Sequence, residues 1–286
     1  MMRAATALTA AVLTAGCIGV VALGSSAKVA IPLRTRVQPF KASDTWQPVT
    51  VEGTFLPEDS AIIVCDMWDK HWCSGATQRV EDLARRMDPV LRKARRAHVL
   101  VIHAPSETMD FYKDYPQRQM ILRVSGFPHP ESLVLTDPPL PIDDSDGGCD
   151  TPGDKEQQVW KRENPLISIG PEDAISDNGN EIYNLLRQRN IHTLFIMGVH
   201  ANMCILNRSF AIKQMTKWGL DCVLVRDLTD AMYNPARKPF VSHAGGTELV
   251  IQHVEKFWCP STLSADLVSA MARAAGSDPQ HPAAKR

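Results

Sequence analysis

The sequence predicts a single α/β domain, a parallel β-sheet of about six strands with helices on both faces in three layers. Short apolar runs alternate with longer segments of helical pattern along the chain. Continuous apolar runs are typical of strands buried on both faces of a parallel sheet, and strands separated by helices indicate βαβ units. The clearest runs are 61–65, 98–103, 193–197 and 221–225.

Composition excludes several classes of protein. The chain has 286 residues, of which 44% are hydrophobic and 22% charged, so a largely disordered chain or a multi-span membrane protein is excluded. Its 31 Lys and Arg residues balance 32 Asp and Glu residues, which gives a formal net charge of -1. Because the chain as a whole carries no basic field, we expect no nucleic-acid partner.

Residues 1–27 have the pattern of a targeting segment. Arg3 is their only charge, and an apolar stretch follows it as far as Gly24. Cleavage after Ala27 would make this an ordinary secretory signal, whereas a lipoprotein box ending at Cys17 would make Cys17 the lipidated residue. The alternative is an uncleaved membrane anchor, since the stretch is close to the length of a membrane span. We expect an exported protein of a bacterial periplasm or cell envelope, with membrane contact only through a lipid on Cys17.

The first half of the mature chain begins with a polar segment. Residues 28–57 are interpreted as an N-terminal arm ahead of a domain over 58–262. A helical pattern over 76–97 follows the first strand. Asp88–Pro89 interrupts this pattern, because Asp suits an N-cap and Pro the first position of a new helix.

The second half continues the alternation after a long loop. Residues 107–155 are rich in Pro, Asp and Gly, and ordered loops of this length are often functional. A third strand is predicted at 156–160, and Gly219 is a natural helix stop. Further predicted helices cover 181–189, 202–218 and 247–257, and residues 263–286 are predicted to form a C-terminal helix and a disordered tail.

The seven cysteines are irregularly spaced and form no C-x-x-C pair, so neither a zinc ribbon nor a disulfide scaffold is indicated. Cys65 and Cys222 lie in or beside apolar runs and are expected to be small buried side chains. Cys73, Cys149 and Cys259 lie in loop-like sequence. An oxidising compartment would allow one disulfide among these three.

Reactive side chains follow three of the predicted strands. Asp66 follows the first strand, Lys161 follows the third, and Cys204 opens the helix after the strand at 193–197. Ligands bind outside the carboxyl ends of strands in open parallel sheets, so these three residues are expected to converge. A thiol near a helix start and a Lys ammonium favours the nucleophilic thiolate. An Asp can take the thiol proton and return it to a leaving amine.

Each of these residues also has a purely structural interpretation: a cap for the Asp, a solvated surface for the Lys, packing for the Cys. Their combination resembles the isochorismatase-like cysteine hydrolases, which include nicotinamidase and N-carbamoylsarcosine amidase. The resemblance covers residues 61–260. It is carried by 196–204 (IMGVHANMC), 62–66 (IIVCD) and 159–161 (VWK). It implies that Asp66, Lys161 and Cys204 are the catalytic residues.

The resemblance also implies a particular backbone at the nucleophile. A cis peptide is expected between Val199 and His200, and it would aim backbone N–H groups at the oxyanion of the reaction. Those groups would belong to His200 or Ala201 and to Cys204. A homo-oligomer is a further expectation from the family.

Departures from the family pattern bear on the substrate. Trp68-Asp69 replaces the usual Gln-Asn, and residues 104–106 (APS) replace the Asp-x-His metal pair of nicotinamidases. We therefore predict neither a metal nor a cofactor. An alternative metal site from Asp69, His71 and His103 is disfavoured, because no short ligand spacing connects them. The candidate substrate-binding residues, each of which could equally belong to the core, are Trp68, Trp72, His103, Phe111, Tyr112 and Asn202.

These observations together predict a hydrolase of a small amide, ureide or carbamoyl compound that acts through a Cys204 thioester. One alternative is vinyl-ether hydrolysis of the isochorismatase type, which does not use the Cys. The other is a non-catalytic exported binding protein on the same fold. The expected partner is a small-molecule substrate.

Overall fold

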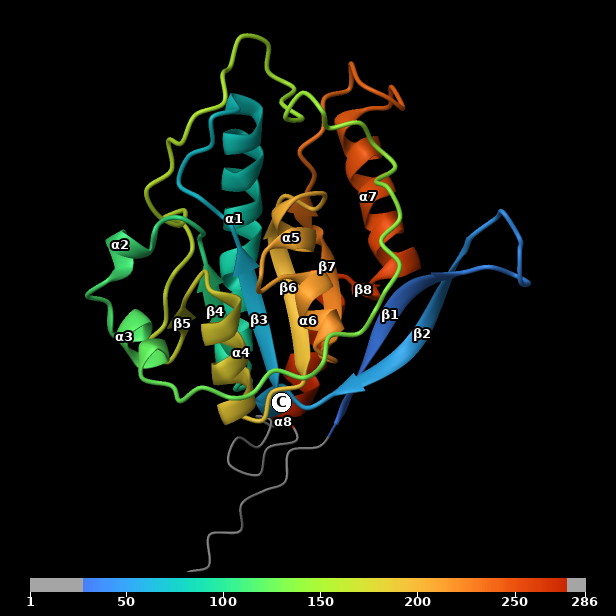
Figure 1. The fold of residues 1–286 in the computed structure, drawn as a ribbon. Helices are drawn as coiled ribbons and strands as arrows, with labels where there is room; N and C mark the ends of the chain where they lie inside the picture. The colour runs from blue at the N-terminus through green and yellow to red at the C-terminus, as the bar shows by residue number, and fades with distance from the viewer. Residues whose placement is uncertain (1–27, 277–286) are drawn as a thin grey trace, which may run out of the picture.

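A computed structural model describes residues 28–276 and contains one eight-stranded sheet in the order β2-β1-β8-β7-β6-β3-β4-β5 (Figure 1). The targeting segment and Cys17 lie outside the described residues. Within 28–276, no helix is long and apolar enough to span a membrane. The strands are β1 (Val29–Val37), β2 (Gln47–Phe55), β3 (Ser60–Cys65), β4 (Leu100–Ala104), β5 (Ala174–Ile175), β6 (Thr193–Val199), β7 (Asp221–Asp230) and β8 (Ser261–Thr262).

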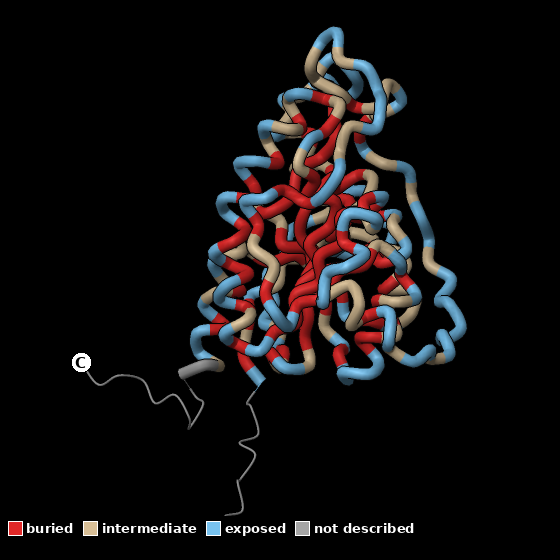
Figure 2. The backbone as a smooth tube through the Cα atoms, turned by 90° about the vertical axis from the view of Figure 1, so that its left-hand side faces the viewer, coloured by how far each residue is buried: buried red, intermediate tan, exposed pale blue. Residues whose placement is uncertain are grey.

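The predicted parallel core is confirmed. Strand β3 pairs in parallel with β4 on one side and β6 on the other, and β6 continues in parallel to β7. Every residue of β3 is buried, as its continuous apolar run requires. Figure 2 shows the buried residues running through the middle of the molecule, with exposed residues on its outer surfaces.

Helices cover both faces of this sheet. Ile62 and Val64 of β3 pack in the cluster formed with α1 (Ser74–Arg96) and α8 (Ser264–Gly276). The alternate side chains of the strand pack in a second cluster, because successive residues of a strand point to opposite faces. That second face is covered by α4 (Gly179–Gln188), α5 (Cys204–Asn207), α6 (Ile212–Lys217) and α7 (His243–Phe257). The remaining short helices are η1 (Pro57–Asp59), α2 (Met109–Tyr112) and α3 (Pro116–Leu122).

The polar segment 28–57 is not a separate arm. Strands β1 and β2 form an antiparallel hairpin, and β1 joins the main sheet through an antiparallel contact with β8. The hairpin therefore extends the predicted sheet to eight strands. Only Val29, Ile31 and Phe55 anchor the hairpin with deeply buried apolar side chains. Because the rest of the segment is mostly polar, its sequence showed no apolar run that would predict a strand.

Two other predicted elements differ. Residues 156–160 form no strand, because Trp160 stacks on Trp68 at 4.4 Å between ring centroids instead of joining the sheet. Helix α1 continues through Pro89 without the predicted break, and the Asp88 carboxylate accepts hydrogen bonds from Ser168. The helix predicted over 202–218 is divided into α5 and α6.

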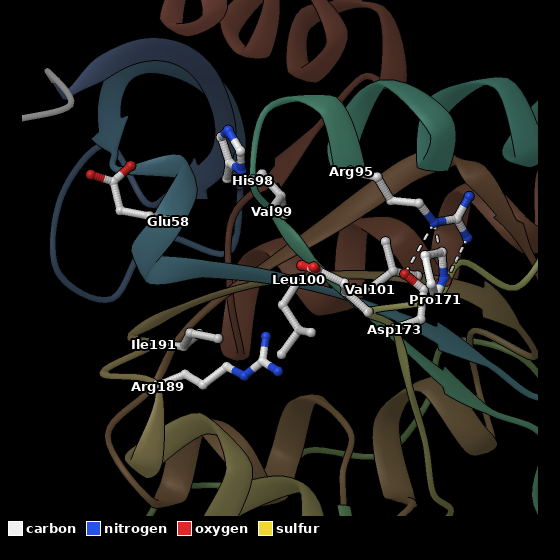
Figure 3. Close-up of a pocket in the computed structure, with 11 residues that line it drawn as sticks. Glu58, Arg95, His98, Val99, Leu100, Val101, Pro171, Asp173, Arg189 and Ile191 are labelled. Atoms are coloured by element: carbon white, nitrogen blue, oxygen red, sulfur yellow. Dashed lines mark hydrogen bonds and ion pairs between the residues drawn. The ribbon is translucent and has the colours of Figure 1, made fainter. Parts of the chain in front are cut away.

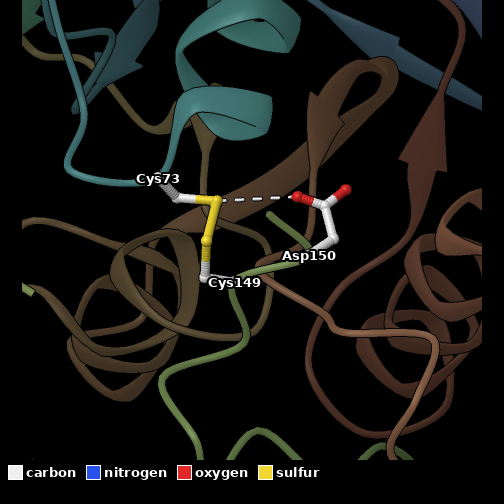
Figure 4. Close-up of side chains that lie close together, drawn as sticks. All are labelled: Cys73, Cys149 and Asp150. Atoms are coloured by element: carbon white, nitrogen blue, oxygen red, sulfur yellow. Dashed lines mark hydrogen bonds between the residues drawn. A yellow bond between two sulfur atoms is a disulfide. The ribbon is translucent and has the colours of Figure 1, made fainter. Parts of the chain in front are cut away.

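A disulfide ties the start of α1 to the long loop. Cys73, the residue that precedes α1, is bonded to Cys149, and their Cα atoms are 5.7 Å apart (Figure 4). The bond joins two of the three cysteines that the sequence singled out, while Cys259 is a buried free thiol. It holds the 147–149 stretch against Trp72 and Met232, where Gly147 and Gly148 approach closely.

Removing this disulfide should destabilise the protein. The bond closes a loop with a sequence separation of 76 residues, so the Cys73→Ser/Cys149→Ser variant should lose about 2–5 kcal/mol of unfolding free energy. Urea titration of both proteins measures the difference. Wild type treated with a dithiol reductant should show the same loss, and an unchanged free energy in the double variant would contradict the expectation.

Candidate active site

Asp66 and Cys204 come together at the carboxyl edge of the sheet. Asp66 directly follows β3, has no exposed surface, and its Oδ1 accepts a hydrogen bond of 2.8 Å from the backbone N–H of Ser106. Cys204 follows the neighbouring strand β6 as the first residue of α5, and is partly exposed. Adjacent parallel strands thus deliver a carboxylate and a thiol to one place.

The turn between β6 and Cys204 has the expected backbone. The Val199–His200 peptide is cis, as the resemblance implied. Gly198 has φ 118°, and a Cβ at this position would lie 2.0 Å from the carbonyl oxygen of Cys65. Only glycine therefore allows β6 to turn this close to β3.

Burial dominates the electrostatics of the pair. It raises the pKa of the Asp66 carboxyl above its usual range, an effect that Arg208, Cys204 and Ser106 partly offset. Burial and the Asp66 charge also raise the pKa of the Cys204 thiol. These shifts favour a protonated Cys204 thiol beside Asp66. This differs from the low thiol pKa that the sequence analysis expected.

The backbone N–H groups at the turn are not equivalent. The His200 N–H lies against the Cys204 sulfur and favours its thiolate. The Ala201 N–H donates to the Asp230 carbonyl oxygen at 2.8 Å, so it is already occupied. Of the three candidate oxyanion donors, Ala201 is therefore excluded, and the His200 N–H would have to leave the sulfur to serve.

Arg208 is the cation beside Asp66, and the sequence analysis missed it. Its Nε donates to Oδ2 of Asp66 at 2.9 Å. Arg208 is the residue directly after α5, four residues after Cys204, so its spacing from Cys204 was a usable indication. The expected cation, Lys161, is exposed, and its backbone N–H donates to Oδ1 of Asp69 at 3.0 Å. The ion pair with Asp66 is thus formed by Arg208 and not by Lys161.

Comparison with known proteins was informative only at the level of structure. No family model matches the sequence, and no curated protein matches it. A cysteine hydrolase from Pseudomonas syringae pv. phaseolicola has a similar structure, with TM-score 0.50, 18% identity, and coverage of 77% of this chain and 95% of that one. This likeness shows that the chain and that cysteine hydrolase share a fold. A putative isochorismatase from Burkholderia xenovorans aligns with TM-score 0.47 and 13% identity over 76% of this chain and 88% of that one.

Three of the predicted substrate-binding residues are buried inside the protein, with their polar atoms already bonded. His103 lies between Glu163 at 2.7 Å and Asp173 at 3.0 Å, through its two ring nitrogens. The Tyr112 hydroxyl accepts the N–H of Glu163. The Asn202 amide binds both backbone groups of Met232 and the Asp144 carboxylate. These contacts give all three residues a structural role.

The other predicted contact residues are less confined. Trp68, two residues after Asp66 in the chain, is 5% exposed. Its indole N–H donates a hydrogen bond to the Ser106 carbonyl oxygen. Trp72 is partly buried beside the disulfide. Phe111 is 43% exposed, with the Arg162 guanidinium 5.5 Å from its ring centroid.

His71, interpreted from sequence as a substrate contact or a structural hydrogen-bonding residue, meets the His200 ring at 5.0 Å between centroids, beside the turn that leads to Cys204. Burial lowers the pKa of His71 to about 4 and that of His200 to about 3, so both imidazoles are neutral. The Nε2 of His200 is buried without a hydrogen-bond partner among residues 28–276.

Two other features do not form part of this centre. A cavity of about 410 Å³ lies at the amino ends of β3, β4 and β6, away from Asp66, and Arg95 and Asp173 lie on its wall (Figure 3). Among residues 28–276, the potential metal ligands Cys73, Cys149 and Asp150 have ligand atoms within 4.8 Å of one another. The two sulfurs are joined to each other (Figure 4), so they offer no thiolate to a metal.

The buried His103 should make stability depend on alkaline pH. Burial alone would lower its pKa, but Glu163 and Asp173 outweigh that effect and raise the pKa to about 9, against about 6.5 in an unfolded chain. The stabilising charge is complete below about pH 6.5 and is lost as pH rises through about 9. His103→Gln leaves the buried Glu163 carboxylate without its cation, while Asp173 keeps Arg95, and should cost about 3–5 kcal/mol at pH 6.

Denaturant titrations of wild type and His103→Gln at pH 6 and pH 9.5 measure this effect. The difference in unfolding free energy between the two proteins should be smaller at the higher pH. A gap of equal size at both values would contradict a charged His103. His98 is exposed and supplies the matched control, His98→Gln, which should change little at either pH.

Proposed function

We propose that this protein is a hydrolase that cleaves a small amide, ureide or carbamoyl compound through a thioester on Cys204. The observation that carries the proposal is the fully buried Asp66 carboxylate beside the Cys204 thiol, with Arg208 paired to the carboxylate. A base, a nucleophile and free N–H donors are the groups that acyl transfer needs. The isochorismatase-like fold supports the same conclusion as an analogy.

In the first half of the reaction, Asp66 accepts the proton of the Cys204 thiol as the sulfur attacks the substrate carbonyl carbon. The N–H groups of His200 and Cys204 donate to the oxygen that becomes negative. Asp66 then gives its proton to the departing nitrogen, the C–N bond breaks, and ammonia or an amine leaves. The acyl group remains on the sulfur as a thioester.

In the second half, water attacks the thioester carbonyl while Asp66 takes one of its protons. The C–S bond breaks, the acid product leaves, and the proton returns to the Cys204 sulfur. The net reaction is amide plus water to acid plus amine, and Asp66 is the only base it uses. Arg208 opposes the effect of burial on the Asp66 pKa and so favours the ionised carboxylate beside the thiol.

We further propose that the enzyme works outside the bacterial cytoplasm, in the periplasm or at the cell envelope. The targeting pattern of residues 1–27 motivates this proposal. The Cys73–Cys149 bond supports it, because disulfides persist in oxidising compartments and are rare in the cytosol.

Ammonia release from a panel of small amides and ureides tests the proposed chemistry. Wild type should release ammonia, and Cys204→Ala should lose at least about a thousandfold in kcat/KM, because the nucleophile is gone. Cys222→Ala, which removes another buried free thiol, is the matched control and should keep its activity. Equal turnover by Cys204→Ala would sink the thioester mechanism and favour vinyl-ether chemistry or another route.

The pH profile tests the role of Asp66. Because burial raises the Asp66 pKa, the acid limb of kcat/KM should lie above the range of an ordinary carboxyl group. Arg208 lowers that pKa, so Arg208→Gln should move the limb to still higher pH and reduce the rate at neutral pH. A limb that stays in place in Arg208→Gln would show that the Asp66–Arg208 pair does not control the base.

A further inference from the structure

One edge of the Arg208 guanidinium is hydrogen-bonded within residues 28–276, and the other edge is not. Its Nε donates to Asp66, but within residues 28–276 neither terminal nitrogen donates a hydrogen bond. The side chain is 30% exposed, so its outer edge is open beside Cys204. An arginine that served only to neutralise Asp66 would not need this second edge.

Glu107 shows that the open edge attracts a carboxylate. Its Oε1 lies 3.6 Å from one terminal nitrogen of Arg208, within ion-pair range but beyond a hydrogen bond. The Glu107 side chain is 49% exposed, while its backbone N–H is fixed by the Asp177 carboxylate at 2.9 Å. A loosely paired, solvated carboxylate can be displaced by one that binds with better geometry.

We infer that the outer edge of Arg208 binds a carboxylate on the substrate, and that Glu107 occupies this edge until the substrate arrives. The planar guanidinium presents two parallel N–H donors, a geometry that matches a carboxylate in a two-point contact. The inference rests on the proposed function and narrows its substrate class to small amides or ureides that carry an acidic group near the carbonyl that is attacked.

Alkylation of Cys204 tests the anion site without any turnover. Iodoacetate and iodoacetamide have nearly the same size, and each transfers its methylene carbon to the sulfur as the C–I bond breaks and iodide leaves. The thiol proton passes to Asp66 and then to solvent. Because both reagents meet the same thiol, the ratio of their rates cancels any change in thiol reactivity and reports only the preference for a negative charge.

The ratio is measured by mass spectrometry of the peptide that contains Cys204. Arg208→Gln should lower the iodoacetate-to-iodoacetamide ratio by about threefold or more, the size expected for a partly exposed ion pair. Glu107→Gln should raise it by a similar factor, since the competing carboxylate is gone. Glu172→Gln makes the same change in net charge at the opposite edge of the sheet and is the matched control.

An unchanged ratio in Glu107→Gln and Arg208→Gln would overturn the inference. An equal rise in Glu107→Gln and Glu172→Gln would also overturn it, because overall charge would then explain the effect. Opposite shifts in Arg208→Gln and Glu107→Gln, with no shift in Glu172→Gln, support the site. Glu107 is on the surface, so its variant remains informative even if Arg208→Gln fails to fold.

A second pair of reagents separates this inference from the proposed function. Succinamate and succinamide differ only in a terminal carboxylate, and hydrolysis of either releases ammonia. A lower KM for succinamate that rises in Arg208→Lys supports both proposals. If the enzyme hydrolyses both amides with the same KM, the proposed carboxylate site is contradicted and the proposed hydrolase function is supported. If the iodoacetate-to-iodoacetamide ratio shifts in opposite directions in the two variants but no amide is hydrolysed, the carboxylate site is supported and the hydrolase function is contradicted.

Discussion

The need to stabilise one carboxylate away from water organises the catalytic edge of this protein. Asp66 has no exposed surface, and an isolated buried charge is too costly to persist unless it is paired and hydrogen-bonded. Three groups meet that need: the Ser106 backbone after β4, and the Cys204 thiol and Arg208 side chain at the two ends of α5. The thiol of the proposed nucleophile is thus located by the same contacts that stabilise the proposed base.

A second buried charge network is centred on His103. His103 on β4 joins Glu163 to Asp173, and Arg95 of α1 pairs with Asp173 on the other side. Glu163 lies in the segment whose backbone pairs with the residues that follow Asp66, including a bridge to Trp68. This network therefore holds a loop without regular secondary structure against the sheet, which explains why a strand was not needed at residues 156–160.

Sequence alone was sufficient where a pattern had one physical meaning. The apolar runs of β3, β4, β6 and β7 could only be buried strands, and strand ends then located Asp66 and Cys204. Prediction from sequence failed where tertiary contacts decided the structure. The polar hairpin at 28–57 is held by a few buried side chains, and Lys161 and Arg208 are both plausible partners of Asp66 until the three-dimensional distances are known. His103 and Asn202 are polar residues near strand ends, but internal partners use their bonding capacity.

Sulfur atoms in opposite redox states lie within one small region of this protein. Cys73 and Cys149 must be oxidised to hold the long loop, while Cys204, a short distance along the same edge, must remain a free thiol to act as a nucleophile. A strong thiol reductant, the usual protectant of cysteine enzymes, would keep Cys204 reduced at the expense of the loop. Recombinant chain made in a reducing cytosol would likewise have an intact nucleophile in a loosened site. Oxidative folding in a periplasmic host, followed by handling without dithiols, is therefore the preparation that would preserve both sulfur states.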